Sequence, residues 1–474
     1  MTTHAHLLER HRTVLPRWLA LYYDEPIELV SGKGCRVTDA EGREYLDFFA
    51  GILTTMTGHA VPEVVEAIRE QAGRMLHSST LYLIRPMVEL AEQIARLSGI
   101  PGAKVFFTPS GTEANEAALL FATSYRRSNQ VLALRNSYHG RGFATIAITG
   151  NRGWSPSSLS PLQVSYVANG DPLRGPIARL CQELGKDECG TDELVAACVE
   201  DLRQVIEMTT AGDVACLIAE PIQGVGGFVT PPDGLFAAYK EVLDSYGILF
   251  VDDEVQTGWG RTGEHFWGIE AHGITPDLLT FAKGLGNGLS IGGVVGRADV
   301  IDSLTANHIS TFGGNPLVCA GALANLRYLL EHDLQGNARE VGGYIKTRLT
   351  ELAGRCGIVG DVRGKGLIIG VDLVEPGTVM PAPQAAGRVL EEAKQRGLLL
   401  GKGGLYGNVL RIAPPLSIGR AEAAEGVDAL VAAIEAANAA AGEVNSGAAA
   451  ASSGAAAASS GAAAVGSGPD GGVS

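Results

Sequence analysis

Lys283 is the residue whose setting most directly suggests covalent chemistry. It follows an apolar run, Leu278–Phe281, and precedes a glycine-rich stretch. An amine at the end of a buried strand loses solvation, so its pKa falls and its neutral form can attack a carbonyl carbon. A lysine whose stem lies on the surface while its head stays in water is the simpler interpretation of this residue taken alone.

Acidic residues end two other apolar runs. Asp252, Asp253 and Glu254 follow residues 248–251, and three adjacent acids repel one another unless a cation or a proton compensates. An acid facing a protonated ring nitrogen would satisfy this condition. A metal would also satisfy it, but no histidine cluster or His-Glu-x-x-His motif is present. Glu220 follows residues 215–219 and predicts either a guanidinium partner or a surface carboxylate.

Two further strand ends carry residues suited to binding. Ser110, Gly111 and Thr112 open a predicted helix whose free N–H groups favour a phosphate, although a plain helix cap uses the same residue types. Tyr138 precedes His139 and a glycine. This pattern allows the tyrosine ring to lie flat on an aromatic ligand, or simply to pack in a turn.

In combination, these residues favour one cofactor. A phosphate cradle, an aromatic plate, a carboxylate for a ring nitrogen and a buried lysine are what a protein needs to hold pyridoxal phosphate as a Schiff base. A dinucleotide is the alternative, because Gly258 to Gly263 formally match the fingerprint of nicotinamide dehydrogenases. That match is weak, since no obvious helix follows it and no acid ends a second strand about 20 residues later.

The elements that must position these residues alternate along the chain. Helices are expected at 62–75, 112–127 and 233–246, and apolar strands at 105–107, 131–134, 215–219, 248–251 and 278–281. Fully apolar strands alternating with helices predict an α/β fold with a mainly parallel sheet covered on both faces and ligands at the carboxyl ends of its strands. After residue 330, helical stretches with strands at 366–373 and 409–412 predict a smaller α+β domain.

Composition excludes several classes of protein. The chain has 474 residues and a net charge of −15, which disfavours binding to nucleic-acid backbones. Its apolar runs fall short of the ~20 residues that span a bilayer, and its N-terminus does not match a secretory signal. Seven scattered cysteines form no Cys-x-x-Cys motif, so we expect neither disulfides nor a metal site. We therefore also expect the protein to lie in the cytoplasm.

Four segments are expected along the chain. Residues 1–60 would join the small domain, 61–330 would form the large cofactor-binding domain, and 331–441 would form the C-terminal part of the small domain. In the last segment, residues 442–474, a seven-residue unit of serine, glycine and alanine repeats from Ser446. Such a unit has little apolar area to offset the entropy of ordering, so we expect a disordered tail rather than an alanine helix.

The chain resembles class III (subgroup II) pyridoxal-phosphate aminotransferases from about residue 20 to 440. The motifs that carry the resemblance are Ser-Gly-Thr-Glu-Ala-Asn-Glu-Ala from Ser110, Tyr-His-Gly from Tyr138, Glu-Pro-Ile-Gln-Gly from Glu220, Asp-Glu-Val-Gln-Thr-Gly from Asp253, Ala-Lys-Gly from Ala282 and Thr-Phe-Gly-Gly-Asn-Pro from Thr311. Within the family, Glu-His-Phe-Trp-Gly at 264–268 and Tyr-Leu-x-x-x-Pro at 82–86 are most like the alanine–glyoxylate aminotransferase 2 type.

This resemblance implies fold type I, with a seven-stranded, mainly parallel sheet in the large domain and a small α+β domain built from both chain ends. It implies a homodimer, with a tetramer left open. Lys283 would form the Schiff base and move the proton, and Asp253 would pair with the ring nitrogen. At the phosphate, the resemblance implies Ser110, Gly111 and Thr112, together with Thr311 of the partner subunit. It places Tyr138 and Val255 on the ring faces and Gln256 at the ring oxygen. His139 and Glu220 are the remaining implied residues of the cofactor site.

The resemblance also implies how substrates bind. Arg411 matches the arginine that binds the amino-acid carboxylate, and Glu220 commonly pairs with it in the family. Arg141 matches an arginine that holds a second carboxylate in 4-aminobutyrate-type and ornithine-type enzymes, and Leu53 and Met56 would line the pocket. The expected activity is ping-pong transfer of an amino group from alanine or a β- or ω-amino acid to glyoxylate, pyruvate or 2-oxoglutarate. A lyase or racemase using the same cofactor is the alternative.

Overall fold

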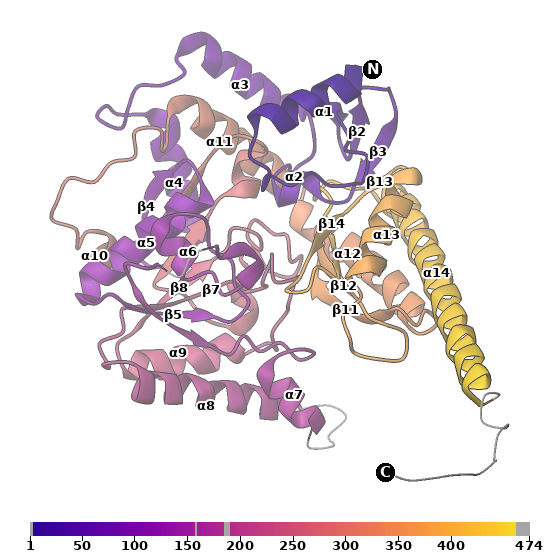
Figure 1. The fold of residues 1–474 in the computed structure, drawn as a ribbon. Coiled ribbons are helices and arrows are strands. Elements are labelled where there is room, and N and C mark those ends of the chain that lie inside the picture. Colours follow the sequence, from indigo (N-terminus) through magenta and orange to yellow (C-terminus); the bar gives the residue numbers. More distant parts are fainter. Residues whose placement is uncertain (1–2, 157–158, 184–189, 461–474) are drawn as a thin grey trace, which may run out of the picture.

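The computed structural model describes residues 3–156, 159–183 and 190–460. A seven-stranded sheet forms the centre of the larger of two lobes (Figure 1). Its spatial order is β4 (Lys104–Thr108), β10 (Gly292–Gly296), β9 (Leu278–Phe281), β8 (Leu249–Asp253), β7 (Cys216–Ala219), β5 (Gln130–Leu134) and β6 (Gln163–Val167). β10 runs against its two neighbours and the remaining pairs are parallel, which confirms the predicted sheet.

Both faces of the sheet are covered. On β7, Cys216 and Ile218 pack in one apolar cluster with α5 (Gly111–Arg126). Leu217 and Ala219 pack in another cluster with α8 (Thr191–Thr209) and α9 (Leu235–Ser245). Alternate side chains of one strand therefore enter two different cores, which is why the strands are apolar throughout.

Other helices complete the large domain. Two of the longer ones, α3 (Pro62–Arg74) and α4 (Arg85–Leu97), both pack against the third, α11 (Pro316–Glu331). The short elements are α2 (Ala50–Leu53), α6 (Phe143–Ala147), η1 (Arg152–Trp154), α7 (Pro176–Glu183), η2 (Gly268–His272), η3 (Lys283–Gly286) and α10 (Ala298–Ile301). Several of these follow a strand directly, so they place their side chains at its carboxyl end.

The small domain contains segments from both ends of the chain, as predicted. One of its two four-stranded sheets has the order β11 (Val359–Lys365), β12 (Ile368–Leu373), β15 (Val409–Ile412) and β14 (Gly401–Gly403), beside α12 (Leu334–Ala353) and α13 (Pro383–Gln395). Its second sheet joins β1 (Leu29–Lys33), β2 (Arg36–Asp39) and β3 (Glu44–Asp47) to β13 (Leu398–Leu399). The parallel pairing of β3 with β13 thus connects the N-terminal segment to the C-terminal third. Helix α1 (Thr3–Val14) precedes these strands.

The last helix differs from the expected disordered tail at 442–474. Helix α14 begins at Arg420 and continues to Ser460 (Figure 1). Alanine has the highest helix propensity of all residues, which is a physical reason for the helix to continue into this alanine-rich stretch. Residues 461–474 lie outside the described part of the chain.

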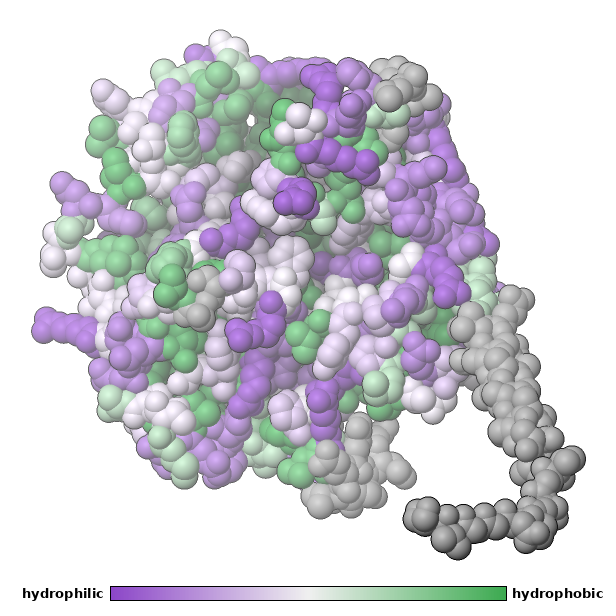
Figure 2. Space-filling view, in the orientation of Figure 1, coloured by the Kyte–Doolittle hydropathy of each residue, from purple (hydrophilic) through white to green (hydrophobic). Residues whose placement is uncertain are grey.

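The visible surface mixes polar and apolar residues (Figure 2). No helix in the described ranges is apolar over a length that would cross a bilayer.

Candidate active site

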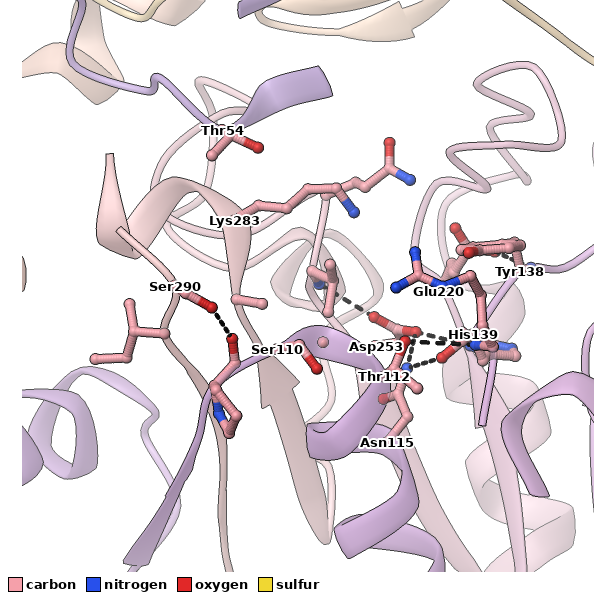
Figure 3. A pocket seen from close by; sticks show the side chains of 18 of the residues that line it. Thr54, Ser110, Thr112, Asn115, Tyr138, His139, Glu220, Asp253, Lys283 and Ser290 are labelled. Carbon is pink, nitrogen blue, oxygen red and sulfur yellow. Dashed lines mark hydrogen bonds and ion pairs between the residues drawn. The ribbon is translucent and has the colours of Figure 1, made fainter. Parts of the chain in front are cut away.

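A cavity of about 370 Å³ lies at the carboxyl ends of the central strands (Figure 3). It brings together most of the residues that the sequence singled out: Ser110, Gly111, Thr112, Tyr138, His139, Arg141, Glu220, Asp253, Val255, Gln256 and Lys283. They come from five different strand ends, which only the fold brings to one place.

The N-terminus of α5 forms one end of the cavity. Ser110 is the N-cap of this helix, and its side chain accepts a hydrogen bond from the Glu113 N–H at 3.2 Å. Gly111 lies so close to the wall that a Cβ atom there would approach both methyl groups of Val255 to 3.2 Å. Free N–H groups, hydroxyl groups and a close backbone approach fit the phosphate group of a cofactor.

Asp253 is held rigidly at the centre of the site. Its Oδ2 accepts hydrogen bonds from Asn115 Nδ2 at 2.8 Å and from His139 Nδ1 at 2.7 Å, and its Oδ1 accepts one from the Val255 N–H at 3.1 Å. This carboxylate is buried and lines the cavity. It therefore fits a protonated ring nitrogen, which a fixed negative charge would keep protonated.

The structure distinguishes Asp253 from its neighbours, which the sequence could not do. Asp252 and Glu254 are fully buried and do not line the cavity, because adjacent residues of a strand point to opposite faces. Glu254 instead accepts hydrogen bonds from Thr257 Oγ1 and the Ile269 N–H. Burial and mutual repulsion raise the pKa of the Asp252 carboxyl well above its usual range.

Lys283 begins η3 immediately after β9 and projects into the cavity (Figure 3). Its backbone φ of 38° lies in the left-handed region, which is unusual for a lysine and marks a tightly constrained position. Burial lowers the pKa of the Lys283 amine to about 8, with Asp253 opposing and Arg411 reinforcing the shift. A neutral amine is thus accessible near neutral pH, as an attack on a carbonyl carbon requires.

Tyr138 supplies an aromatic wall. Its ring contacts that of Trp154 edge to face, with centroids 5.6 Å apart. Its N–H donates to Glu220 Oε1 at 2.9 Å, and burial raises the pKa of its hydroxyl. Tyr138 and Val255 both line the cavity, so they can contact the faces of a planar ring.

Arg411 lies behind the cavity and does not pair with Glu220. Its Nη2 donates to Gln256 Oε1 at 2.8 Å, and its guanidinium stands over the rings of Phe49 and Phe228. Glu220 is occupied by two backbone N–H groups, those of Tyr138 and Gly224. The hydrogen bonds of the structure therefore differ from the Glu220–Arg411 pair that the family resemblance implied.

Besides Arg411, three predicted site residues do not line this cavity. Leu53 and Met56 are 2% and 1% exposed and belong to apolar clusters, so the structure does not support their predicted place in the substrate pocket; Thr54 lines it instead. Left-handed φ angles of 67° at Ile52 and 60° at Leu53 turn the chain here, which no spacing rule could reveal. Thr311 lies on the surface.

Asn115 is a site residue that sequence reasoning missed. Besides Asp253, its Nδ2 bonds the His139 carbonyl, and its Oδ1 accepts from Thr280 Oγ1 at 2.7 Å. It is the polar exception among the buried residues of α5, whose other buried members are alanine, leucine and phenylalanine. A lone amide on an apolar helix face could have indicated it.

The glycines from Gly258 to Gly263 do not form a dinucleotide site. They lie in turns, and a Cβ at Gly263 would come within 2.5 Å of Arg339 Cα on α12. Their role is close packing between the domains, and the next helical element, the short η2, begins only at Gly268.

The fold and this cavity define an enzyme of pyridoxal-phosphate chemistry. The sequence model of class III aminotransferases matches residues 22–434, and the chain belongs to that family. It is a pyridoxal-phosphate-dependent transaminase that moves an amino group from an amino acid to a 2-oxo acid.

Individual relatives include both transaminases and racemases. The chain is 39% identical to alanine–glyoxylate aminotransferase 2 homolog 2, mitochondrial, of Arabidopsis thaliana, over 90% of this chain and 86% of that protein. It is also 39% identical to a leucine/methionine racemase of Thermococcus litoralis, over 90% and 95%. A pyridoxal-phosphate-bound amine transaminase from an uncultivated Pseudomonas species has a TM-score of 0.82 at 31% identity, over 90% and 99%.

Proposed function

We propose that Lys283 and Asp253 are the catalytic residues of this transaminase. The supporting observation is that a buried amine with a lowered pKa and a carboxylate held by three hydrogen bonds face the same cavity. When bound, pyridoxal phosphate supplies an aldehyde carbon and an electron-withdrawing ring.

Lys283 has two tasks in this proposal. Its neutral Nζ would hold the cofactor by the aldehyde carbon, with release of water, and when free of it the same Nζ would accept the proton of the substrate Cα and later donate it. A pKa of about 8 suits both directions of this transfer, because the amine is neither strongly basic nor permanently neutral. Asp253 would face the ring nitrogen of the cofactor, and its three hydrogen bonds fix its orientation.

The arginines define the substrate class. We assign the α-carboxylate of the substrate to Arg411, whose Nε is buried without a partner among the described residues. Arg141 lines the cavity near Tyr138 and is available for a second carboxylate. The preferred donors are therefore alanine and β- or ω-amino acids, and the preferred acceptors are glyoxylate, pyruvate and 2-oxoglutarate.

A single-turnover experiment tests the transaminase mechanism. The absorbance of the bound cofactor should shift when alanine is added without an acceptor, with one oxo acid released per site, and should return when pyruvate or glyoxylate is added. Lys283→Ala should abolish the cycle, whereas Lys104→Ala, at an exposed lysine paired with Asp302, should leave it intact.

The racemase relative makes a second outcome worth measuring. A racemase would convert L-alanine to D-alanine without releasing a stoichiometric oxo acid. That result, or full turnover by Lys283→Ala, would contradict our assignment. A panel of amino donors against the three oxo acids then identifies the substrates.

We also propose a homodimer. The segments 75–83 and 309–312 expose large apolar side chains and touch through the rings of His77 and Phe312, whose centroids are 5.4 Å apart. Thr311 lies on this surface, which supports its assignment to the phosphate site of the partner subunit.

The cytoplasm remains our proposed compartment. Cys35, Cys198, Cys216, Cys319 and Cys356 are free and buried, and burial raises their thiol pKa values. Reduced, unreactive thiols are compatible with a reducing environment.

A further inference from the structure

Arg261 is a buried cation that the proposed reaction does not use. It belongs to the glycine-rich segment after β8 and is 1% exposed. Its Nη1 donates to two carbonyl oxygens, those of Leu367 at 3.0 Å and Pro414 at 2.8 Å. Its Nη2 has no partner among the described residues, and burial lowers the pKa of its guanidinium to about 9 with no opposing acid. A buried charge without a counter-ion is costly for stability, so its presence needs another explanation.

Both carbonyl groups flank the pair of strands that carries Arg411. Leu367 immediately precedes β12, and Pro414 follows β15 by two residues. Gly370 of β12 pairs directly with Arg411 of β15. The Arg261 guanidinium therefore binds the chain at the start of β12 and just after the end of β15. The Leu367 N–H also donates to the Arg261 carbonyl at 3.0 Å, which makes the connection reciprocal.

The same large-domain segment holds Arg411 from its other side. Gln256, five residues before Arg261, accepts the hydrogen bond from Arg411 Nη2 at 2.8 Å. Residues 256–261 therefore contact both the tip of the Arg411 side chain and the ends of its strand. The position of that guanidinium relative to the cavity depends on this double connection between large and small domains.

We propose that Arg261 is a positioning residue that fixes Arg411 for the substrate carboxylate and so sets the preference of the enzyme for amino acids over simple amines. This inference rests on the proposed role of Arg411. A side chain with a single hydrogen-bond donor could not bind both carbonyl groups at once, as the guanidinium of Arg261 does. The role is indirect, because Arg261 does not line the cavity.

The test compares two donors on holoenzyme: alanine, and benzylamine, which has no carboxylate. The quantity measured is the ratio of their kcat/KM values, together with the inhibition constant of propionate, a carboxylate without an amine. Arg411→Met should lower the ratio by up to about a hundredfold and Arg261→Met by about tenfold, with matching losses of propionate affinity. Because both changes act on one contact, the double variant should show no lower ratio than Arg411→Met alone.

A matched control separates positioning from general damage. Arg43 also uses one guanidinium nitrogen for two backbone carbonyl groups, those of Lys394 and Gln395, but it lies on the N-terminal segment away from Arg411. Arg43→Met should leave the ratio unchanged. If Arg261→Met does not fold, Arg261→Lys should show the same selective loss to a smaller degree.

Several outcomes would overturn the inference. Equal losses for alanine and benzylamine in the Arg261 variants, or losses that add to those of Arg411→Met, would show that Arg261 serves only the fold. An unchanged ratio in Arg411→Met would refute the assigned role of Arg411 itself, and the positioning role with it. A selective loss in Arg411→Met but none in the Arg261 variants would refute the positioning role alone.

Discussion

At the scale of single residues, the environment of Lys283 sets a pH at which the cofactor can attach. Only the neutral amine reacts, so for a pKa of about 8, lowered from 10.5, the attachment rate of added pyridoxal phosphate should rise up to about pH 8 and then level off. The rate of appearance of visible absorbance between about pH 6 and pH 10 measures this. A rate that still rises steeply at pH 10 would show that the pKa of Lys283 is not lowered. The Lys283→Ala variant serves as the control for absorbance that does not arise from this lysine.

The residue scale also shows where spacing stops being informative. Lys283 and the acids after β8 could be found from the sequence because each ends an apolar run. The choice between Asp252 and Asp253 depends on which face of the strand points to the cavity, which the resemblance supplied and the structure shows directly. Leu53 and Met56 remain predictions as pocket residues: in the structure both side chains are buried in apolar clusters, and the left-handed turn that contains Leu53 has no sequence signal.

At the scale of elements, the apolar strands and the helices between them could be predicted, and those expectations are confirmed within a few residues. β10 escaped prediction because its sequence, Gly-Gly-Val-Val-Gly, resembles a loop. Glycine is required in this strand because the neighbouring backbone lies very close to it. A Cβ at Gly293 would come within 2.5 Å of the Phe106 carbonyl oxygen on the adjacent strand. Partners distant in sequence impose this requirement, so a local pattern cannot reveal it.

The N-terminus of α5 combines a structural and a binding task, and one variant can measure both. Ser110→Ala removes the cap, which should lower the free energy of unfolding by about 1 kcal/mol. It also removes a hydroxyl from the proposed phosphate site, which should weaken pyridoxal-phosphate binding by about tenfold. Urea unfolding of the apoenzyme and titration with the cofactor give the two values.

Asp333→Ala is the control for that experiment. Asp333 caps α12 by accepting a hydrogen bond from the Gly336 N–H, away from the cavity. Its loss should destabilise the protein comparably without changing cofactor affinity. Equal changes of affinity in both variants would mean that the effect of Ser110 passes through stability alone.

At the scale of the whole molecule, the exposed apolar segments predict how two chains meet. Leu83 is 99% exposed and Phe312 62% exposed, and such side chains gathered on one surface indicate an interface. Leu83→Asp should shift the protein from dimer to monomer in light scattering. Met208→Asp, at an equally apolar but separate position on α8 that is 75% exposed, should not. A wild-type monomer at micromolar concentration would contradict the proposed dimer.

Mixing two inactive variants tests whether the sites are shared between subunits. If Thr311 completes the phosphate site of the partner subunit, Lys283→Ala and Thr311→Ala chains form a hybrid dimer with one intact site, because that site takes its lysine from one chain and its threonine from the other. Co-refolded mixtures should then regain up to a quarter of the wild-type cofactor sites, since about half of randomly paired dimers are hybrids with one site of two restored. The mixture would bind no more tightly than the separate variants if each site were built from a single chain.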